Sequence, residues 1–303
     1  MAASANTRAL TRRSTAYGKR WANILTYFGL FCWLGFVFFP LYWLFTMSVK
    51  REMDIFTRPP MLTGFEPTLD NYLNVLNIAR VGLLVNVGVP VSDFPLYFRN
   101  SLIIVGCAIT ITVVVGLFAA YAISRLRFFG REAISILILF TQMIPHLTIL
   151  MPLYIIYRTV GLYNTYQGLI LAYQLFSLPY FIWLLRSHVT AVPLELEDAA
   201  RVDGCNLLQI LWNVVLPLVT PGLVSTGILV FIGMWNTFIT ALLLGGSGIQ
   251  PVVVGIMNYS TYSQVHWALL SAAAVITITP SIIAGLWIQR YIVKGLSAGS
   301  VKG

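Results

Sequence analysis

Charged residues are scarce in this 303-residue chain: Asp, Glu, Lys and Arg together make up 10% of it, and only ten residues are acidic. A soluble domain carries about 25% charged residues, so the composition excludes a water-facing surface of normal size. Hydrophobic residues, in contrast, make up 58% of the chain. The sequence therefore favours a protein whose natural solvent is a lipid bilayer.

Other absences exclude classes of chemistry. No pair among the three cysteines has the spacing of a metal-ligand set or of a disulfide framework. No nucleophile and base stand in a recognisable arrangement, so we predict no catalytic residue and no metal site. A phosphate-binding loop of the G-x-x-x-x-G-K-[ST] type is also missing. If ATP drives this protein, another chain binds the nucleotide, and we expect no cofactor in this one.

Long apolar runs are what the sequence does have. A membrane-spanning helix needs about 20 mainly apolar residues, and six runs qualify. We predict six transmembrane helices at Asn23–Met47, Asn100–Ser124, Ala133–Tyr157, Tyr166–Leu185, Leu218–Leu244 and Trp267–Ile288. The first run is too long for the core of a cleaved signal peptide, which is about 7–15 residues, so we expect it to be a retained span. The fold class is an all-α integral membrane protein.

The distribution of Lys and Arg predicts the orientation of the spans. Thirteen of the 19 basic residues fall in segments 1–22, 124–131, 186–217 and 289–303, and six fall in the segments on the opposite side. Cytoplasmic loops carry the excess of positive charge. We therefore predict that both termini are cytoplasmic, with 1–22 as an N-terminal tail, 23–294 as the transmembrane domain and 295–303 as a C-terminal tail.

The external loop, residues 49–98, contains five prolines and is not another span. Within it, residues 68–76 are predicted to form a short helix, with Thr68 or Asp70 as its cap. We find no internal repeat and no separate soluble domain.

The densest acidic stretch lies between the fourth and fifth spans, in a cytoplasmic loop (residues 187–217) that we call the elbow. Pro193 fits a first helical position, and the acids of the following turn suit the positive end of the helix dipole. Glu197 and Arg201 have the favourable i, i+4 order. Gly204 fits a helix stop, and Asn206 with Gln209 has the spacing of a capping box that begins a second helix.

That second helix, predicted at Leu207–Leu216, carries more apolar surface than a solvated loop needs, and Pro217 and Pro221 separate it from the fifth span. Two interpretations remain open on physical grounds. The elbow is a solvated connector between spans, or it is a docking surface, because an exposed apolar patch is usually an interaction site.

The elbow resembles the EAA loop of bacterial ABC import permeases, whose pattern is E-A-A, three residues, G, nine residues and I-x-L-P. Here the pattern reads Asp198, Ala199, Ala200, then Gly204, then Val214, Leu216 and Pro217. Asp replaces the first Glu, Val replaces Ile, and Glu197 could supply the longer acid one position earlier. "FRNSL" (98–102), "MWNTFITALLL" (234–244) and "QRYIVKGLSAGSVKG" (289–303) resemble the MalG-type branch of carbohydrate import permeases.

This resemblance implies a subunit of an ABC sugar importer in the bacterial inner membrane. Its implied partners are a second, MalF-like permease, two copies of an ATPase that binds ATP and Mg, and an extracytoplasmic solute-binding protein, with no nucleic acid. The elbow would contact the ATPase through Glu197, Asp198, Ala199, Ala200, Asp203, Gly204, Leu216 and Pro217. The residues leave a disaccharide, an oligosaccharide, a polyol or glycerol phosphate open as substrate.

The resemblance also implies that the C-terminal tail contacts the ATPase, through Gly295, Ser297, Gly299 and Ser300. Its composition fits an extended insertion or a frayed terminus. Among polar residues in the spans, Asn236 and Gln142 are candidates for lining the pathway. An interhelical hydrogen bond explains Asn236 equally well. His146 and Gln174 invite the same two interpretations, but His146 also follows Pro145, and a helix broken at that proline would need a polar partner there.

Two other functions are possible for such a chain. A secondary, ion-coupled transporter would need ionisable coupling residues inside the membrane, and no Asp or Glu lies in a predicted span core. A membrane-embedded enzyme would need clustered carboxylate, His or Cys side chains near one interface. Both alternatives leave the elbow unexplained.

Overall fold

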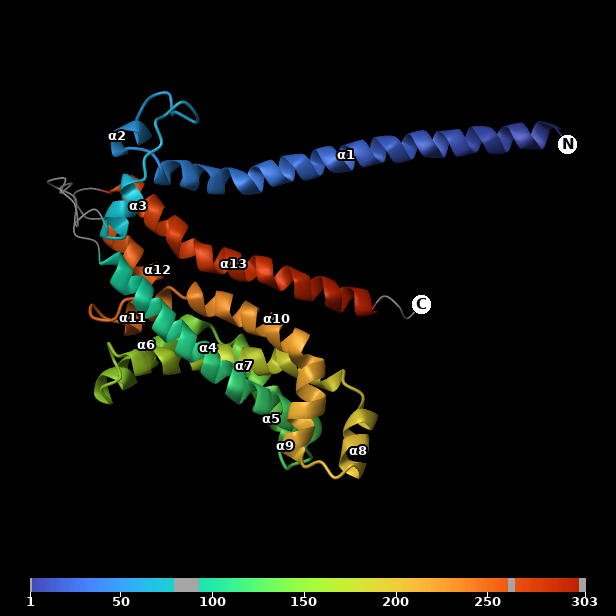
Figure 1. The fold of residues 1–303 in the computed structure, drawn as a ribbon, viewed down its shortest axis with the longest axis vertical. Coiled ribbons are helices and arrows are strands. Elements are labelled where there is room, and N and C mark those ends of the chain that lie inside the picture. Colours follow the sequence, from blue (N-terminus) through green and yellow to red (C-terminus); the bar gives the residue numbers. More distant parts are fainter. Residues whose placement is uncertain (1, 79–92, 261–264, 300–303) are drawn as a thin grey trace.

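The computed structural model describes residues 2–78, 93–260 and 265–299, with side chains described from residue 23 to residue 289 within these ranges. The described secondary structure is helical, apart from one antiparallel bridge between Ser260 and Val265. Five long helices dominate Figure 1: α1 (Ala2–Ser48), α4 (Phe94–Arg125), α7 (Tyr166–Thr190), α10 (Leu216–Trp235) and α13 (Trp267–Gly299).

Shorter elements connect these helices. They are α2 (Glu52–Ile55), α3 (Asp70–Val75), α5 (Arg131–Met143), α6 (His146–Thr159), α8 (Leu194–Val202), α9 (Leu207–Ile210), the π turn η2 (Leu211–Val215), α11 (Ile239–Leu244), α12 (Val252–Gly255) and the 3-10 turn η3 (Ile256–Tyr259). By length and composition, five helices can cross a membrane, or six if the bent pair α5 and α6 forms one span.

The core of the bundle lies between α4, α7 and α10, and α13 packs against α10. Polar side chains inside the bundle are hydrogen-bonded between helices. Gln174 of α7 donates to the carbonyl of Ala108 at 2.8 Å and accepts from the hydroxyl of Thr112 at 2.7 Å, both on α4. Buried polar groups cost free energy unless they are paired, so Gln174 joins two helices, which is one of the two interpretations left open for it.

Helix α1 extends from the bundle as a long arm and packs against α13 (Figure 1). Its apolar side chains from Ile24 to Phe39 are exposed in this isolated chain. The predicted N-terminal tail is helical from Ala2 and continues into the first predicted span without a break. Nothing interrupts it, because the first proline in the chain is Pro40.

The predicted third span, Ala133–Tyr157, is a broken helix rather than a continuous one. It divides at Ile144 and Pro145 into α5 and α6, which are bent by 95°. Pro145 has no N–H to donate and restricts the residue before it to extended conformations; Ile144 has φ −76° and ψ 125°. Pro152, in contrast, is accommodated inside α6.

The predicted fifth span, Leu218–Leu244, is also corrected at both ends. At its C-terminal end, the helix stops at Trp235, the last residue of α10 (Leu216–Trp235), and α11 is a separate short helix. At the other end, α9, η2 and α10 form one continuous helical stretch from Leu207 to Trp235. The predicted separate helix before Pro217 is therefore wrong. Pro217 is accommodated inside this stretch just after the π turn, in which the Leu216 amide donates to the Leu211 carbonyl.

The external segment follows the prediction more closely. Helix α3 forms within residues 68–76, with Leu69 rather than Thr68 or Asp70 at the N-cap. The Thr68 hydroxyl accepts a hydrogen bond from the Asp70 amide at 3.1 Å. The carboxylate of Glu52 accepts from the amides of Trp267 and Ala268, each at 2.9 Å, and so joins α2 to the N-terminal end of α13.

The "FRNSL" segment begins the buried part of α4 and holds a distant loop. Asn100 is 1% exposed; its amide donates to the Gln250 carbonyl at 3.1 Å, and its oxygen accepts from the Tyr166 hydroxyl at 2.6 Å. The neighbouring Ser101 hydroxyl accepts from the Val252 amide at 2.8 Å. These contacts tie α4, α7 and the start of α12 together.

Figure 1 separates the two ends of the bundle. Helices α2, α3 and α12 lie at one end, while the N-terminal end of α1, the C-terminal end of α13, α8 and α9 lie toward the other. The elbow thus lies toward the same end as both chain termini.

Candidate functional site

The first helix of the elbow is α8, with Pro193 at its N-cap rather than at the predicted first helical position. The helix ends in a Schellman motif. The Cys205 amide donates to the Ala200 carbonyl at 3.0 Å, and the Gly204 amide donates to the Arg201 carbonyl at 3.0 Å. Gly204 has φ +86°, a conformation that glycine adopts without steric cost. The predicted glycine stop is confirmed.

The predicted capping box is also confirmed. Asn206 accepts from the Gln209 amide at 3.0 Å, and the Gln209 side chain accepts from the Asn206 amide at 2.8 Å. Helix α9 then passes into the π turn η2, where the Leu216 amide donates to the Leu211 carbonyl. Ile210, Leu211 and Val215 are buried, so the apolar side chains of this stretch are divided between the core and the surface.

The acids of the elbow differ sharply in their environments. Glu195, Asp198 and Asp203 are exposed, whereas the side chain of Glu197 is fully buried. Arg201 Nη1 lies 2.5 Å from Asp198 Oδ1 and Arg201 Nη2 lies 4.0 Å from Glu197 Oε2. The predicted i, i+4 pair is therefore the longer of the two contacts. Glu197 faces inward and does not belong to the exposed acidic surface.

The partners of Glu197 come from α4. Arg125 Nε lies 2.6 Å from Glu197 Oε1, and the Tyr121 hydroxyl donates to Glu197 Oε2 at 3.1 Å. Neither residue was singled out from the sequence. Arg125 contributed only one of the basic charges that set the orientation, and no local pattern connects it with an acid so far along the chain.

The outer surface of the elbow is apolar as well as acidic. Large exposed hydrophobic side chains on it are Leu194, Leu196, Val202, Leu207, Leu208 and Trp212. Of the predicted coupling residues, Ala199, Gly204 and Pro217 are exposed, Leu216 is half-buried and Ala200 is buried. A folded, capped element with this much exposed apolar surface is typical of an interaction site.

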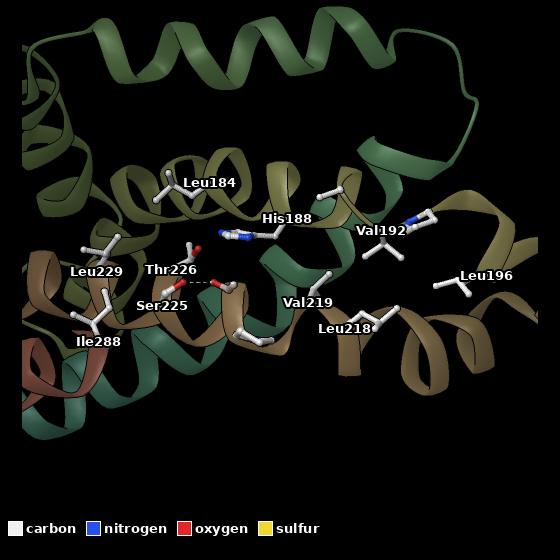
Figure 2. A pocket seen from close by; sticks show the side chains of 14 residues that line it. Leu184, His188, Val192, Leu196, Leu218, Val219, Ser225, Thr226, Leu229 and Ile288 are labelled. Carbon is white, nitrogen blue, oxygen red and sulfur yellow. Dashed lines mark hydrogen bonds between the residues drawn. The ribbon is translucent and has the colours of Figure 1, made fainter. Parts of the chain in front are cut away.

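A cavity of about 650 Å³ lies beside the elbow. Figure 2 shows its lining: His188 from α7, Leu196 from α8, Ser225 and Thr226 from α10, and Ile288 from α13. At Gly222 of α10, a Cβ atom would lie 2.3 Å from His188 Cγ. Helices α7 and α10 therefore approach closely at this position, and the cavity lies beside the contact.

A smaller cavity, of about 280 Å³, lies where α5 and α6 meet α7 and α10. Gln142, His146, Phe176 and Tyr180 are among its lining residues. Gln142 donates to the Phe176 carbonyl at 3.3 Å, and the rings of His146 and Phe176 are 4.3 Å apart at their centroids. Polar groups beside aromatic rings suit a hydroxyl-bearing solute.

The second candidate for lining the pathway, Asn236, does not line that cavity. It is the C-cap residue of α10 rather than a mid-span residue, because the helix ends at Trp235. Its side chain donates to the Ile232 carbonyl at 2.8 Å and to the Ser281 hydroxyl of α13 at 3.2 Å. The interhelical hydrogen bond that was one of its two interpretations is present.

The predicted C-terminal tail is helical over the part that the structure describes. Helix α13 continues through Gly295 and Ser297 to Gly299, so an extended chain is wrong for these residues, and Ser300 lies outside the described residues. The small residues of this segment do not end the helix before Gly299. Within the described ranges, no group of three or more His, Cys, Asp or Glu side chains could hold a metal ion.

Comparison with known proteins gives a consistent result. The family model described as "Binding-protein-dependent transport system inner membrane component" matches residues 112–298, which include the elbow and both cavities. The trehalose/maltose transport system permease protein MalG of Thermococcus litoralis is 35% identical over 267 residues, covering 88% of this chain and 91% of the relative. The diacetylchitobiose uptake system permease protein DasC of Streptomyces coelicolor is 31% identical, covering 96% and 100%.

Among solved structures, a chain of a bacterial ABC transporter involved in the import of the acidic polysaccharide alginate superposes with a TM-score of 0.75. It is 22% identical, and the match covers 90% of this chain and 96% of that one. This likeness shows that the two chains share their fold.

Proposed function

The chain belongs to the family of binding-protein-dependent transport system inner membrane components, and we propose that it is the permease subunit of an ATP-driven ABC importer for a sugar or oligosaccharide. It is a multi-pass protein of the bacterial inner membrane. The observation that carries the proposal is the near full-length similarity to two permeases named for the transport of trehalose, maltose and diacetylchitobiose.

The proposed complex has four kinds of subunit. This chain and a second, MalF-like permease form the translocation pathway, two ATPase copies bind ATP and Mg, and a solute-binding protein delivers the sugar outside. The lack of a phosphate-binding loop in this sequence supports a separate ATPase. The structures that share this fold include a complex with an oligosaccharide-bound periplasmic protein.

The elbow is the proposed contact with the ATPase. Its support is a rigid frame, capped at Gly204 and Asn206, that presents Asp198, Ala199 and Asp203 beside exposed leucines. This surface requires a cleft with apolar walls and basic side chains. Closure of the ATPase dimer on ATP would displace the elbow and, through it, the spans.

The proposed orientation has the elbow and both termini in the cytoplasm. The excess of Lys and Arg in the segments on that side supports it, and so does the position of α8 and α9 toward the same end as both termini (Figure 1). Within the membrane, the cavity beside Gln142 is the proposed part of this subunit's pathway, because its aromatic and polar lining suits a sugar. The five long apolar helices of the described residues contain no Asp or Glu that could couple transport to an ion, which disfavours an ion-coupled transporter.

Reconstitution tests this function. The complete complex in proteoliposomes should take up a labelled saccharide only with ATP inside and binding protein outside, whereas this purified subunit alone should not hydrolyse ATP. The substrate follows from calorimetry of the cognate binding protein with trehalose, maltose, diacetylchitobiose and alginate oligosaccharides. Robust hydrolysis by the single subunit, or uptake driven by an ion gradient without ATP, would contradict the proposal.

A further inference from the structure

The contact between Arg125 and Glu197 is unusual among the ion pairs of the described residues, because both side chains are buried. Their side chains are 4% and 0% exposed, whereas the Arg51–Glu66 pair is 61% and 85% exposed. The contact is ionic rather than an aligned hydrogen bond, although the two atoms are 2.6 Å apart. It lies between the last residue of α4 and the first turns of α8.

Arg125 also binds the end of a third helix. Its Nη2 atom donates to the Val189 carbonyl at 2.7 Å and to the Val192 carbonyl at 2.6 Å. Val189 lies in the last turn of α7 and Val192 lies just beyond its C-cap, Ala191, where a cation is favoured by the helix dipole. One guanidinium thus joins α4, α7 and α8.

Stability alone does not account for such a pair. Replacing a buried ion pair by apolar residues of similar volume is often neutral or stabilising, because two charges lose their hydration. What the ion pair provides is a fixed geometry: the guanidinium must meet a carboxylate on α8 and two carbonyls at and just beyond the end of α7 at once. A pair of leucines would fill the space without specifying these partners.

The opposite side of the elbow is attached differently. There a cavity of about 650 Å³ lies between α8 and parts of α7, α10 and α13 (Figure 2), although α7 and α10 pack against each other elsewhere along their length. The chain continues from α9 to α10 through the π turn η2, an irregularity that often marks a functional position in a helix. An open cavity and a π turn can both absorb a displacement that close-packed side chains would resist.

We propose that Arg125 is a positioning residue that holds α8 to α4 and α7 through Glu197, so that a displacement of the elbow moves α4, α7 and α8 as one body. The cavity and η2 then take up the movement relative to α10 and α13. This inference rests on the proposed function, since it requires that a partner ATPase displaces the elbow.

The first test measures distances between helices in a protein that keeps Arg125 and Glu197 unchanged. The three native cysteines of this chain are first replaced. Spin labels are then introduced in pairs at positions that are exposed in this chain, and the complex is assembled. One pair is Glu195→Cys on α8 with Val114→Cys on α4, and the other is Glu195→Cys with Leu286→Cys on α13. Between the nucleotide-free and ATP-bound states, the distance from α8 to α4 should stay constant and the distance from α8 to α13 should change. A change of similar size in both distances overturns the proposal.

The second test separates positioning from stability. The double variant Arg125→Met/Glu197→Leu removes both charges, and Glu197→Gln removes one while keeping an acceptor for Tyr121. The exposed pair, as Arg51→Gln/Glu66→Gln, is the matched control. The apolar double variant should assemble with the ATPase and keep hydrolysis within about twofold, but the sugar transported per ATP should fall at least tenfold.

The outcomes are distinguishable. A wild-type transport-to-hydrolysis ratio in the apolar double variant shows that the pair only stabilises the fold, and overturns the inference. If the variants fail to assemble, the wild-type distances still decide it. Absence of ATP-dependent uptake by the wild-type complex contradicts the proposed function instead, and that measurement is made first.

Discussion

Asn206 and Gln209 cap each other across the first turn of α9: each side chain accepts a hydrogen bond from the other residue's backbone amide, at 3.0 and 2.8 Å. This reciprocal pair begins the helix that leads through η2 into α10. It also fixes the direction in which the chain leaves the Gly204 turn. The geometry of the elbow surface thus depends on two exposed amide side chains that touch no other element in the hydrogen bonds described.

Replacing Asn206 by Ala should destabilise the elbow locally. The variant leaves the Gln209 amide without its side-chain acceptor, and the loss of such an N-cap costs about 1 kcal/mol. Hydrogen exchange of the backbone amides from 205 to 212 should accelerate about fivefold. The control is Asn213→Ala, an exposed amide in the adjacent π turn. Equal exchange in the two variants would show that the capping box contributes nothing to the elbow.

Asn100 should matter for global stability, because it is buried and bonded on both sides of its amide. Asn100→Ala leaves the Gln250 carbonyl and the Tyr166 hydroxyl without this partner, which costs about 1–3 kcal/mol. Asn100→Asp keeps the acceptor for Tyr166 and loses the donor. In thermal unfolding in detergent, the melting temperatures of Asn100→Asp and Asn100→Ala should both lie below that of the wild type. The melting temperature of Arg99→Ala, a variant of the exposed neighbour, should be unchanged. A wild-type melting temperature for Asn100→Ala contradicts the assignment.

Gly204→Val should uncouple or disassemble the ATPase without preventing membrane insertion. No atom lies within 4 Å of a Cβ built at this position, so space is available and the backbone conformation alone is strained. A β-branched residue at φ +86° costs roughly 1–3 kcal/mol. Asn tolerates this conformation better, so Gly204→Asn should be milder.

The measurements for Gly204 are co-purification of the ATPase and ATP-driven uptake. The matched control is Gly285→Val in α13, where a Cβ also meets no atom within 4 Å and the glycine does not have a positive φ. If Gly204→Val transports and co-purifies like the wild type, the elbow is not the contact with the ATPase.

The local features of the elbow could be predicted because each depends on residues within a few positions of one another. The glycine that ends a helix and the Asn-x-x-Gln capping box can both be recognised from a few neighbouring residues, and the structure contains both. Hydropathy located the spans because a bilayer imposes a minimum length. Composition does not determine how sharply such a run bends, so the 95° angle at the break beside Pro145 and the end of α10 at Trp235 were not predicted.

The environment of Glu197 could not be predicted for a different reason. Its neighbours in sequence are exposed acids, and its partners Arg125 and Tyr121 lie on α4. Only the packing of α4 against α7 brings that helix end beside α8. Sequence reasoning therefore assigned Glu197 to the surface that contacts the ATPase, whereas the structure places its side chain inside the elbow.

The orientation predicts a labelling pattern. Single cysteines are introduced at Gly204, at Thr63 and at Ser300, in a chain whose native Cys32, Cys107 and Cys205 are replaced. In intact cells, a membrane-impermeant maleimide should label Thr63→Cys and leave Gly204→Cys and Ser300→Cys unlabelled until the membrane is opened. The physical reason is the excess of Lys and Arg on the side of the elbow, together with an even number of crossings when α5 and α6 count as one span.

Labelling of Ser300→Cys from outside would mean an odd number of crossings. In that case the bent pair α5 and α6 enters and leaves the membrane on the same side, and the elbow and the C-terminus lie together on the opposite side of the membrane from the N-terminus.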